Sequence, residues 1–404
     1  MDLIELHRDK LTLGMSLRYT LRDETGAVLL GKGHRIDTAQ QLANLKSRKS
    51  IFIEMDESDE SVRVLMSGLA DLDRAGAPIK DFAKFLQLKK GPTEEKLGGT
   101  FVQRWSDVES LLGGLLANMS TVTDFEPRLR TLAQHIQLLL TEDSNASQFL
   151  LFNRAVSHFN GYSVLHSLLC TALAHSLAGV FTLSDLERRS LICAALTMNC
   201  AMTSLQDELT VQKAVPTPYQ RRMIDNHATA GRQMLIQAGV LDMLWLETVD
   251  KHHAALAGPE TLADWPQLDR MAKILQTVDR YTAAMSPRKS RAGRTARDSV
   301  RTVIVQAGST KHDEVGTALV RILGLSPPGT YVKLANGETA VVMRRGPSPN
   351  EPLVASVLNR NDEPIAEPRL HDTAREKLPV AATLAATSIR INLKMDNMLR
   401  LMPK

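Results

Sequence analysis

Apolar positions along the chain recur mainly at helical intervals. Residues 101–119 carry one such stripe and residues 129–140 carry a second, which is the spacing of amphipathic helices. Nearer the two ends, "MSLRYTLRDETGAVLLGKGHRI", "SIFIE", "TYVKLANGETAVVMRR", "PLVASVLN" and "SIRINLK" are β-prone runs. The pattern predicts a mainly α protein: a helical bundle with a small N-terminal β-rich module and a small C-terminal β region.

Changes in this pattern divide the chain. The polar run "LKKGPTEEKLGGT" reads as an exposed connection, and Asn336-Gly337 is a strong hairpin signal in the C-terminal part. We expect a β-rich module, a linker, amphipathic helices leading into the bundle, the bundle itself and a C-terminal β-rich segment, at residues 1–75, 76–100, 101–160, 161–325 and 326–404. The amphipathic helices would dock on the bundle or form a homodimer.

Ionisable side chains lie on the apolar faces of the predicted helices between residues 162 and 285. Such a group is costly to bury unless it is hydrogen-bonded, paired or bound to a metal. One of them alone is more often a hydrogen-bonded core residue than a ligand. Several in one helical block favour a shared metal site, and they are His166, His227, His252, His253 and Asp279.

Two of the helices in this block have sequence signals that can be checked. One begins with Thr217 as N-cap, Pro218 at the first helical position and Gln220 completing a capping box. On another, helical spacing aligns His252 with an apolar stripe that includes Leu241.

The order of these residues, with "VDRYTAAMS" around the aspartate and "LGLSPPGTYVKLANGETAVVMRR" after the bundle, resembles the HD-GYP branch of the HD phosphohydrolase superfamily. The resemblance covers about residues 150–345. It implies a helical bundle that holds two or three iron or manganese ions and hydrolyses the bacterial second messenger cyclic di-GMP. It also implies which residues bind the metal. His166 corresponds to the family's first metal-binding histidine, His227 to the histidine before its paired histidines, His252 and His253 to that pair, and Asp279 to its last aspartate.

The chain departs from this family at its defining residues. Met198 and Asn199 stand where the family has its His-Asp pair, and the lysine that usually follows shortly after that pair is missing. Ala254 replaces a glutamate after the paired histidines, and the Gly-Tyr-Pro turn is absent. A carboxylate normally helps to hold two ions together, whereas an asparagine amide carries no charge and a thioether favours soft ions. We therefore expect one iron or manganese ion at most, none if the site is fully degenerate, and no efficient dinuclear hydrolysis.

A basic segment follows the aspartate, in "SPRKSRAGRTARDSVRTVIV". It is either a solvated helix face or a site for phosphate, which guanidinium groups bind bidentately. The family has a basic segment here near its nucleotide. The resemblance therefore makes Arg288, Lys289 and Arg291 candidates for binding an anionic ligand.

Composition adds modest limits. The 404 residues carry a net charge of +4, which does not point to a nucleic acid polymer as partner. The three cysteines form no CxxC motif, as expected for reduced thiols in the cytoplasm. Neither a signal peptide nor an apolar run of transmembrane length is apparent, so we expect a soluble cytoplasmic protein without a membrane partner.

Three functional hypotheses remain. The favoured one is a catalytically degenerate HD-GYP-like signalling protein that binds a cyclic dinucleotide or a protein partner without efficient hydrolysis. The second is a metal-dependent phosphohydrolase that hydrolyses cyclic di-GMP at a reduced site. The third is an interaction scaffold that resembles the HDOD group, in which the helical fold persists without the chemistry.

Overall fold

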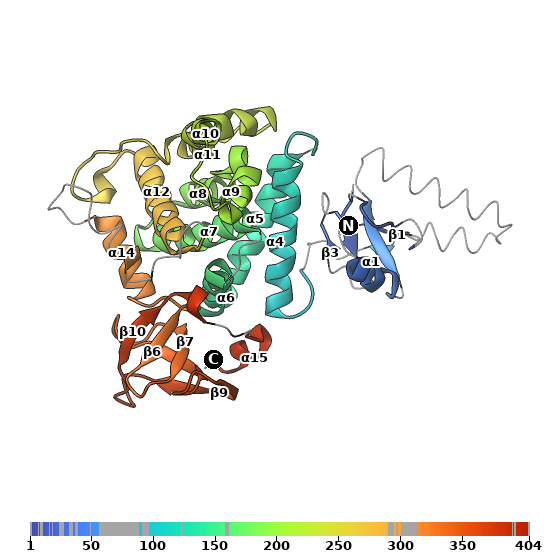
Figure 1. The fold of residues 1–404 in the computed structure, drawn as a ribbon. Coiled ribbons are helices and arrows are strands. Elements are labelled where there is room, and N and C mark those ends of the chain that lie inside the picture. The colour runs from blue at the N-terminus through green and yellow to red at the C-terminus, as the bar shows by residue number, and fades with distance from the viewer. Residues whose placement is uncertain are drawn as a thin grey trace. The chain divides into compact units, whose positions relative to one another are not determined.

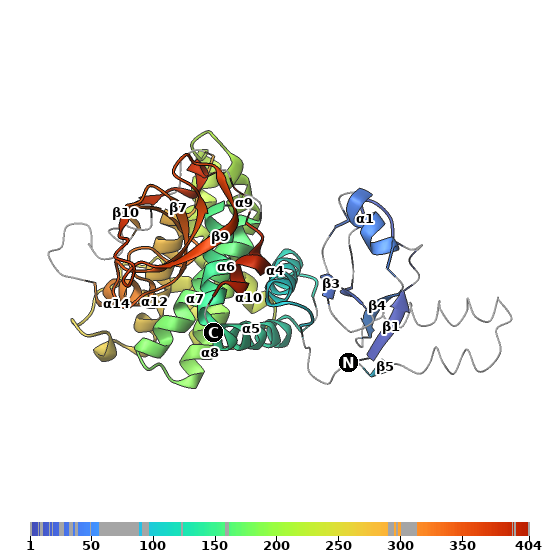
Figure 2. The ribbon, with the colours of Figure 1, turned by 90° about the horizontal axis from the view of Figure 1, so that it is seen from below.

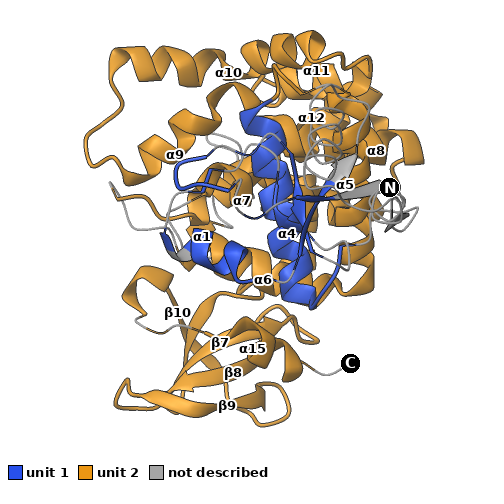
Figure 3. Cartoon of the chain, turned by 90° about the vertical axis from the view of Figure 1, so that its right-hand side faces the viewer, with its two compact units in different colours: residues 1–118 blue, residues 119–404 orange. Residues whose placement is uncertain are grey.

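The structure of the chain is a computed structural model that falls into two compact units, Met1–Asn118 and Met119–Lys404 (Figure 3). Each unit is described by itself, and the five-part division expected from the sequence stays a prediction. The structure describes residues 2–6, 8, 11–15, 17, 19–23, 28–31, 35–36, 39–48, 50–55, 89–90, 97–122, 124–157, 161–289, 295, 298–299, 313–389, 391 and 393–402.

The first unit contains a small antiparallel sheet in the order β3-β2-β4-β1-β5. Leucine and isoleucine side chains of this sheet and its loops, among them Leu21 and Ile53, form a buried core. The predicted β-rich N-terminal module is therefore confirmed. Its elements are β1 (Asp2–Leu6), β2 (Leu21–Arg22), β3 (Val28–Leu30), α1 (Ala39–Lys46), β4 (Ile51–Met55), β5 (Lys89–Lys90) and α4 (Phe101–Ala117).

The second unit is mainly helical, and α7 runs through its centre (Figures 1 and 2). Helices α6, α8, α9, α12 and α14 all contact α7. The helical elements are α5 (Phe125–Glu142), α6 (Ser144–Ser157), α7 (Tyr162–Val180), α8 (Asp185–Thr197), η2 (Cys200–Met202), α9 (Thr203–Val211), α10 (Pro218–Gln237), α11 (Met243–Lys251), η3 (Leu262–Asp264), α12 (Gln267–Met285) and α14 (Glu314–Leu323).

Helix α7 is long and apolar enough to cross a membrane, which the sequence analysis did not expect. It has 19 residues and a mean hydropathy of 1.4 over its most apolar window, and 72% of that window is buried inside the protein. Length and hydropathy alone do not separate a membrane span from a buried core helix. Here the surrounding helices account for the apolar composition.

Local signals correctly located the start of α10 and mislocated that of α11. The Thr217 hydroxyl accepts a hydrogen bond from the Gln220 backbone N–H, and the Gln220 side chain accepts one from the Thr217 N–H, as predicted. Leu241, expected on the stripe of His252, is instead 84% exposed. The reason is that Asp242 is the N-cap of α11, where its carboxylate accepts the Trp245 N–H, so Leu241 precedes the helix.

An antiparallel sheet in the order β10-β6-β7-β8-β9 follows the bundle. Gly337 has a φ of +88° in the predicted hairpin turn. The run 388–394, expected to be a strand, is not one at its described residues: Ser388 ends η4, and Lys394 is the N-cap of α15. The elements are β6 (Tyr331–Leu334), β7 (Thr339–Arg344), β8 (Leu353–Leu358), β9 (Pro364–Asp372), β10 (Val380–Leu384), η4 (Ala386–Ser388) and α15 (Met395–Arg400).

The C-terminal sheet joins the bundle through a close contact with α6. The Asn153 amide donates hydrogen bonds to the Gly329 carbonyl and to the Tyr331 hydroxyl. Gly329 has a φ of +83°, and a Cβ there would lie 2.5 Å from the Phe149 carbonyl oxygen, so only glycine fits. The mainly α architecture with a β region at each end agrees with the prediction.

Candidate metal centre

His227 lies on the buried face of α10, close to the segment that follows α8. Its side chain is accessible over only 3% of its surface, and its Nδ1 faces the Ile224 carbonyl one turn earlier. One turn later, Gly231 lets α10 approach η2: a Cβ at this position would lie 3.3 Å from Cys200 Sγ and 3.8 Å from the Met198 carbonyl oxygen. The helix containing His227 therefore packs tightly against the chain around Met198 and Asn199.

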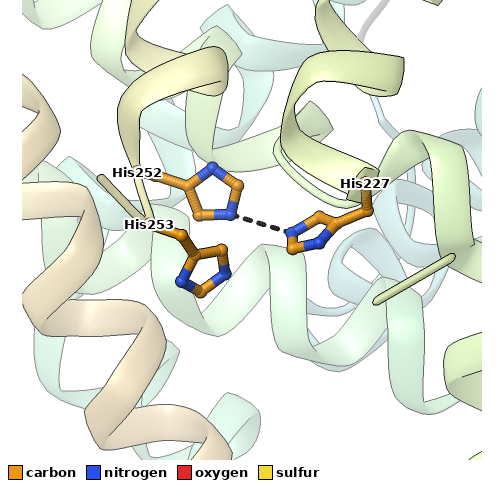
Figure 4. Close-up of side chains that lie close together, drawn as sticks. All are labelled: His227, His252 and His253. Carbon is orange, nitrogen blue, oxygen red and sulfur yellow. Dashed lines mark hydrogen bonds between the residues drawn. The ribbon is translucent and has the colours of Figure 1, made fainter. Parts of the chain in front are cut away.

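The paired histidines stand at the C-terminal end of α11. His252 is the C-cap and is fully buried, with its Nδ1 2.6 Å from the Val249 carbonyl oxygen. The side chain of His253 is 43% exposed. Their ring centroids lie 4.1 Å apart, and the His227 ring is 5.1 Å from His252 and 4.9 Å from His253 (Figure 4). One helix end thus directs two imidazoles toward a third from α10.

The hydrogen-bond pattern of His227 and His252 suits a cation. Backbone carbonyls only accept hydrogen bonds, so the Nδ1 atom that faces one must carry the proton. In the neutral ring, Nε2 then presents a lone pair, and the two Nε2 atoms lie 3.1 Å apart. Burial lowers the pKa of both residues, to about 3 for His252, which also lies beside His253. Two lone pairs at this distance repel each other unless a positive ion lies near both.

A second group lies around Asp279 of α12 and His166 of α7. The Asp279 Oδ1 is 2.8 Å from His166 Nε2, and both residues are buried. Burial alone would raise the pKa of Asp279, but the hydrogen bond and positive charge of His166 bring it far below its usual range. Burial would also lower the pKa of His166, yet the neighbouring Cys170 and Tyr162 and the bond to Asp279 raise it well above its usual value. Both shifts favour the charged forms of the two residues.

Asp279 stands between the two groups. While its Oδ1 contacts His166, its Oδ2 lies 3.8 Å from His253 Nε2. The structure therefore brings together all five residues that the sequence analysis selected, from helices α7, α10 and α12 and the end of α11. That they bind metal stays a prediction.

Met198 and Asn199, which the sequence resemblance aligns with the family's His-Asp pair, lie at the end of α8. Both are buried, at 0% and 2% exposure. Neither the amide nitrogen nor the amide oxygen of Asn199 has a hydrogen-bond partner among the described residues. Buried polar atoms are rarely left in this state, and a bound ion or water is a common explanation. The facing histidine nitrogens fit a metal ion, and Asn199 supplies no carboxylate that would bridge two.

No protein-family model matches the sequence. The chain is 25% identical, over 187 residues, to "Cyclic di-GMP phosphodiesterase PA4108" of Pseudomonas aeruginosa, a match that covers 46% of this chain and 45% of that protein. Among solved structures, the HDG"Y"P protein Bd1817 from Bdellovibrio bacteriovorus is similar at a TM-score of 0.44 and 14% identity, over 80% of this chain and 99% of that one. The chain is related to the HD-GYP family.

In this HD-GYP-related chain, the candidate phosphate-binding residues differ in their surroundings. The Arg288 guanidinium lies 5.8 Å from the centre of the Tyr162 ring, and its Nε is buried without a hydrogen-bond partner among the described residues. Lys289 is exposed, and its backbone N–H donates to the Thr210 carbonyl. Arg291 lies outside the described residues. Arg288 is thus the candidate that lies beside Tyr162, whose ring stacks on His166.

Contacts from other helices hold the start of α11 in this HD-GYP-related bundle. The Asp242 carboxylate accepts hydrogen bonds from Ser190 of α8 and from Arg130 of α5. The Trp245 indole donates to the Thr197 hydroxyl at 2.7 Å, and Thr197 immediately precedes Met198. Trp245 lies two helical turns before His252, so this hydrogen bond ties the helix that carries the paired histidines to the end of α8.

Two residues that contact His166 were not predicted from the sequence to belong to the site. Cys170 Sγ lies 3.7 Å from His166 Nε2, and the Tyr162 hydroxyl lies 3.4 Å from His166 Nδ1. Both stand four residues from the histidine, which places all three on one helix face. The i, i+4 spacing of His166 and Cys170 could have identified the thiol, but a buried cysteine reads first as a small core residue.

Proposed function

We propose that this chain is a catalytically degenerate HD-GYP-related signalling protein that binds cyclic di-GMP without hydrolysing it efficiently. The observation that carries the proposal is Asn199, buried at the family's aspartate position with both amide atoms unpartnered among the described residues. The match to the Pseudomonas phosphodiesterase spans about half of each chain, and it supports the choice of cyclic di-GMP as ligand.

The loss of negative charge at Asn199 affects hydrolysis more than binding. Two-metal hydrolysis needs two ions held close together, and a bridging carboxylate offsets the repulsion between them. A neutral amide provides an oxygen ligand without that charge. A single iron or manganese ion at His227, His252 and His253 is compatible with the remaining donors, and when bound it would supply positive charge for a phosphate.

Binding can use groups that the substitutions leave intact. Arg288 has a buried Nε without a partner among the described residues, next to the Tyr162 ring that stacks on His166. A guanidinium donates paired hydrogen bonds to phosphate oxygens, and such charge-assisted bonds are stronger than neutral ones. We therefore assign Arg288 to one phosphate of the cyclic dinucleotide, with Lys289 and Arg291 as further cationic candidates.

The test is a calorimetric titration of the full chain with cyclic di-GMP, with and without Mn²⁺, and with cyclic di-AMP as the matched control. The proposal predicts saturable binding of cyclic di-GMP that is at least tenfold tighter than binding of the adenine analogue. Equal or undetectable heats for both nucleotides at 100-fold excess over protein would contradict it.

The retained cluster of His227, His252 and His253 favours one alternative, a working phosphohydrolase with a reduced metal site. Under this alternative, cyclic di-GMP would be cleaved in the presence of Mn²⁺, and the activity would depend on His252. A His252→Ala variant separates the two accounts, because the degenerate protein has no activity for this substitution to remove.

A further inference from the structure

Cys170 completes a second group of potential metal ligands, apart from the three histidines. Its Sγ lies 3.7 Å from His166 Nε2, which is in turn 2.8 Å from Asp279 Oδ1. The three donor atoms all lie within 4.8 Å of one another. All three residues are buried: His166 is 1% exposed, Cys170 is 0% and Asp279 is 8%. A nitrogen, a sulfur and an oxygen donor therefore converge in a site shielded from water.

Helix geometry explains why the thiol points toward the histidine. His166 and Cys170 are four residues apart on α7, so their side chains lie one above the other on the same face. Helix α12 packs against this face and brings Asp279 to it. The site is thus built from two core helices, and elements of this kind hold ligands more rigidly than loops do.

Tyr162 contacts the other ring nitrogen of His166. Its Nδ1 lies 3.4 Å from the Tyr162 hydroxyl, and the two rings are stacked with centroids 5.4 Å apart. Metal-binding histidines generally use one ring nitrogen as a ligand and donate the other N–H to a nearby oxygen. When Nδ1 donates to the tyrosine oxygen, Nε2 is left to face Cys170 and Asp279.

The other two cysteines lack such partners among the described residues. Cys193 and Cys200 are buried but belong to no group of three potential ligands there. Burial raises the pKa of both thiols to about 12, which makes them inert core residues. Cys200 Sγ contacts the Gly231 carbonyl oxygen at 3.7 Å. The two residues are therefore matched controls for Cys170.

We propose that His166, Cys170 and Asp279 bind a thiophilic divalent ion of the Zn²⁺ type, with Cys170 as a thiolate ligand. Thiolate, imidazole and carboxylate are the three protein donors that zinc commonly uses, whereas manganese and magnesium prefer oxygen. On binding, a metal–sulfur bond replaces the S–H bond of Cys170 and a metal–nitrogen bond replaces the Nε2–H bond of His166, and both protons leave to solvent. The site differs in chemistry from the all-nitrogen cluster of His227, His252 and His253. The inference does not rest on nucleotide binding, so the two proposals can fail separately.

The test is a Co²⁺ titration of the metal-free full-length protein, because a cobalt–thiolate bond produces a ligand-to-metal charge-transfer band in the near ultraviolet. The proposal predicts this band in the wild type, in Cys193→Ser and in Cys200→Ser, and its loss in Cys170→Ser. Circular dichroism establishes that each variant is folded. A wild type without the band, or a folded Cys170→Ser variant that keeps it, would overturn the proposal.

A second measurement needs no variant and covers the case in which Cys170→Ser does not fold. Zinc X-ray absorption of the wild-type protein loaded with two equivalents of Zn²⁺, enough for both groups of potential ligands, reports the atoms in the first coordination shell. We expect a sulfur scatterer at about 2.3 Å. A shell of nitrogen and oxygen alone would refute a thiolate ligand.

Discussion

The Nε2 atoms of His227 and His252 face each other at 3.1 Å, while the Nδ1 of each ring faces a backbone carbonyl. No neutral tautomer that keeps both carbonyl contacts places a proton between the two Nε2 atoms. The arrangement is unfavourable in isolation and becomes favourable when a cation is bound. A metal ion bound by the histidines, as proposed above, would remove this repulsion.

Removing His252 should abolish this histidine site. We expect His252→Ala to lower the affinity for Mn²⁺ at least tenfold, because a buried nitrogen ligand is lost. His175→Ala is the control, since His175 is half-buried on α7 and belongs to neither group of potential ligands. Calorimetric titration of both variants with Mn²⁺ measures the difference. Equal affinities would mean that the three histidines are only packed together.

Restoring a carboxylate beside the site should strengthen it. We expect Asn199→Asp to raise the affinity for Mn²⁺ about tenfold or more, because an anionic oxygen is a far better ligand for a hard cation than an amide. Asn226→Asp adds the same charge at an exposed position next to His227 and should have little effect. If the two substitutions change the affinity equally, the gain reflects net charge and not coordination by residue 199.

Arg288 and Lys289 should contribute unequally to nucleotide binding. Arg288→Ala removes a partly buried guanidinium and should weaken cyclic di-GMP binding about tenfold or more. Lys289→Ala removes an equal charge from an exposed side chain, so we expect less than about a threefold loss. Fluorescence titration with a labelled nucleotide compares the two variants. A larger loss for Lys289→Ala would remove Arg288 from the proposed site.

The ion pair between Glu187 and Arg270 should make the bundle sensitive to acid. Burial alone would raise the pKa of Glu187, but hydrogen bonds from Ser184 and Arg270 and the charge of Arg270 lower it. The stabilisation is therefore present above the unfolded value of about 4.3 and is lost as the pH falls through the lower folded value. At pH 7, Glu187→Gln should reduce the free energy of unfolding by about 1–3 kcal/mol.

Urea unfolding at pH 7 and at pH 3.5 measures this contribution. The difference between wild type and Glu187→Gln should shrink at the lower pH. Glu247→Gln is the control, because Glu247 pairs with Arg232 at the surface, where each side chain is more than a quarter exposed, and should cost less than about 1 kcal/mol. A difference that is the same at both pH values would show that the effect of residue 187 is not electrostatic.

Sequence periodicity located the helices and selected side chains that meet in space. The capping box at Thr217 and the inward-facing Asp279 follow from local spacing, which one sequence displays directly. Cys170 was not selected as a ligand, because its role depends on which residue of α12 lies opposite. The start of α11 was misplaced, since the Asp242 cap involves α5 and α8 as well as its own helix. The Nδ1–carbonyl contacts, and hence the facing Nε2 atoms, could not be read from the sequence.

The most direct test of the account is the fate of the nucleotide after binding. Full-length protein, supplied with Mn²⁺ and iron under anaerobic conditions, is incubated with equimolar cyclic di-GMP and denatured, and the released nucleotide is separated by chromatography. The account predicts intact cyclic di-GMP in an amount equal to that bound. Conversion to linear dinucleotide or GMP in the wild type, and its loss in His252→Ala, would contradict it.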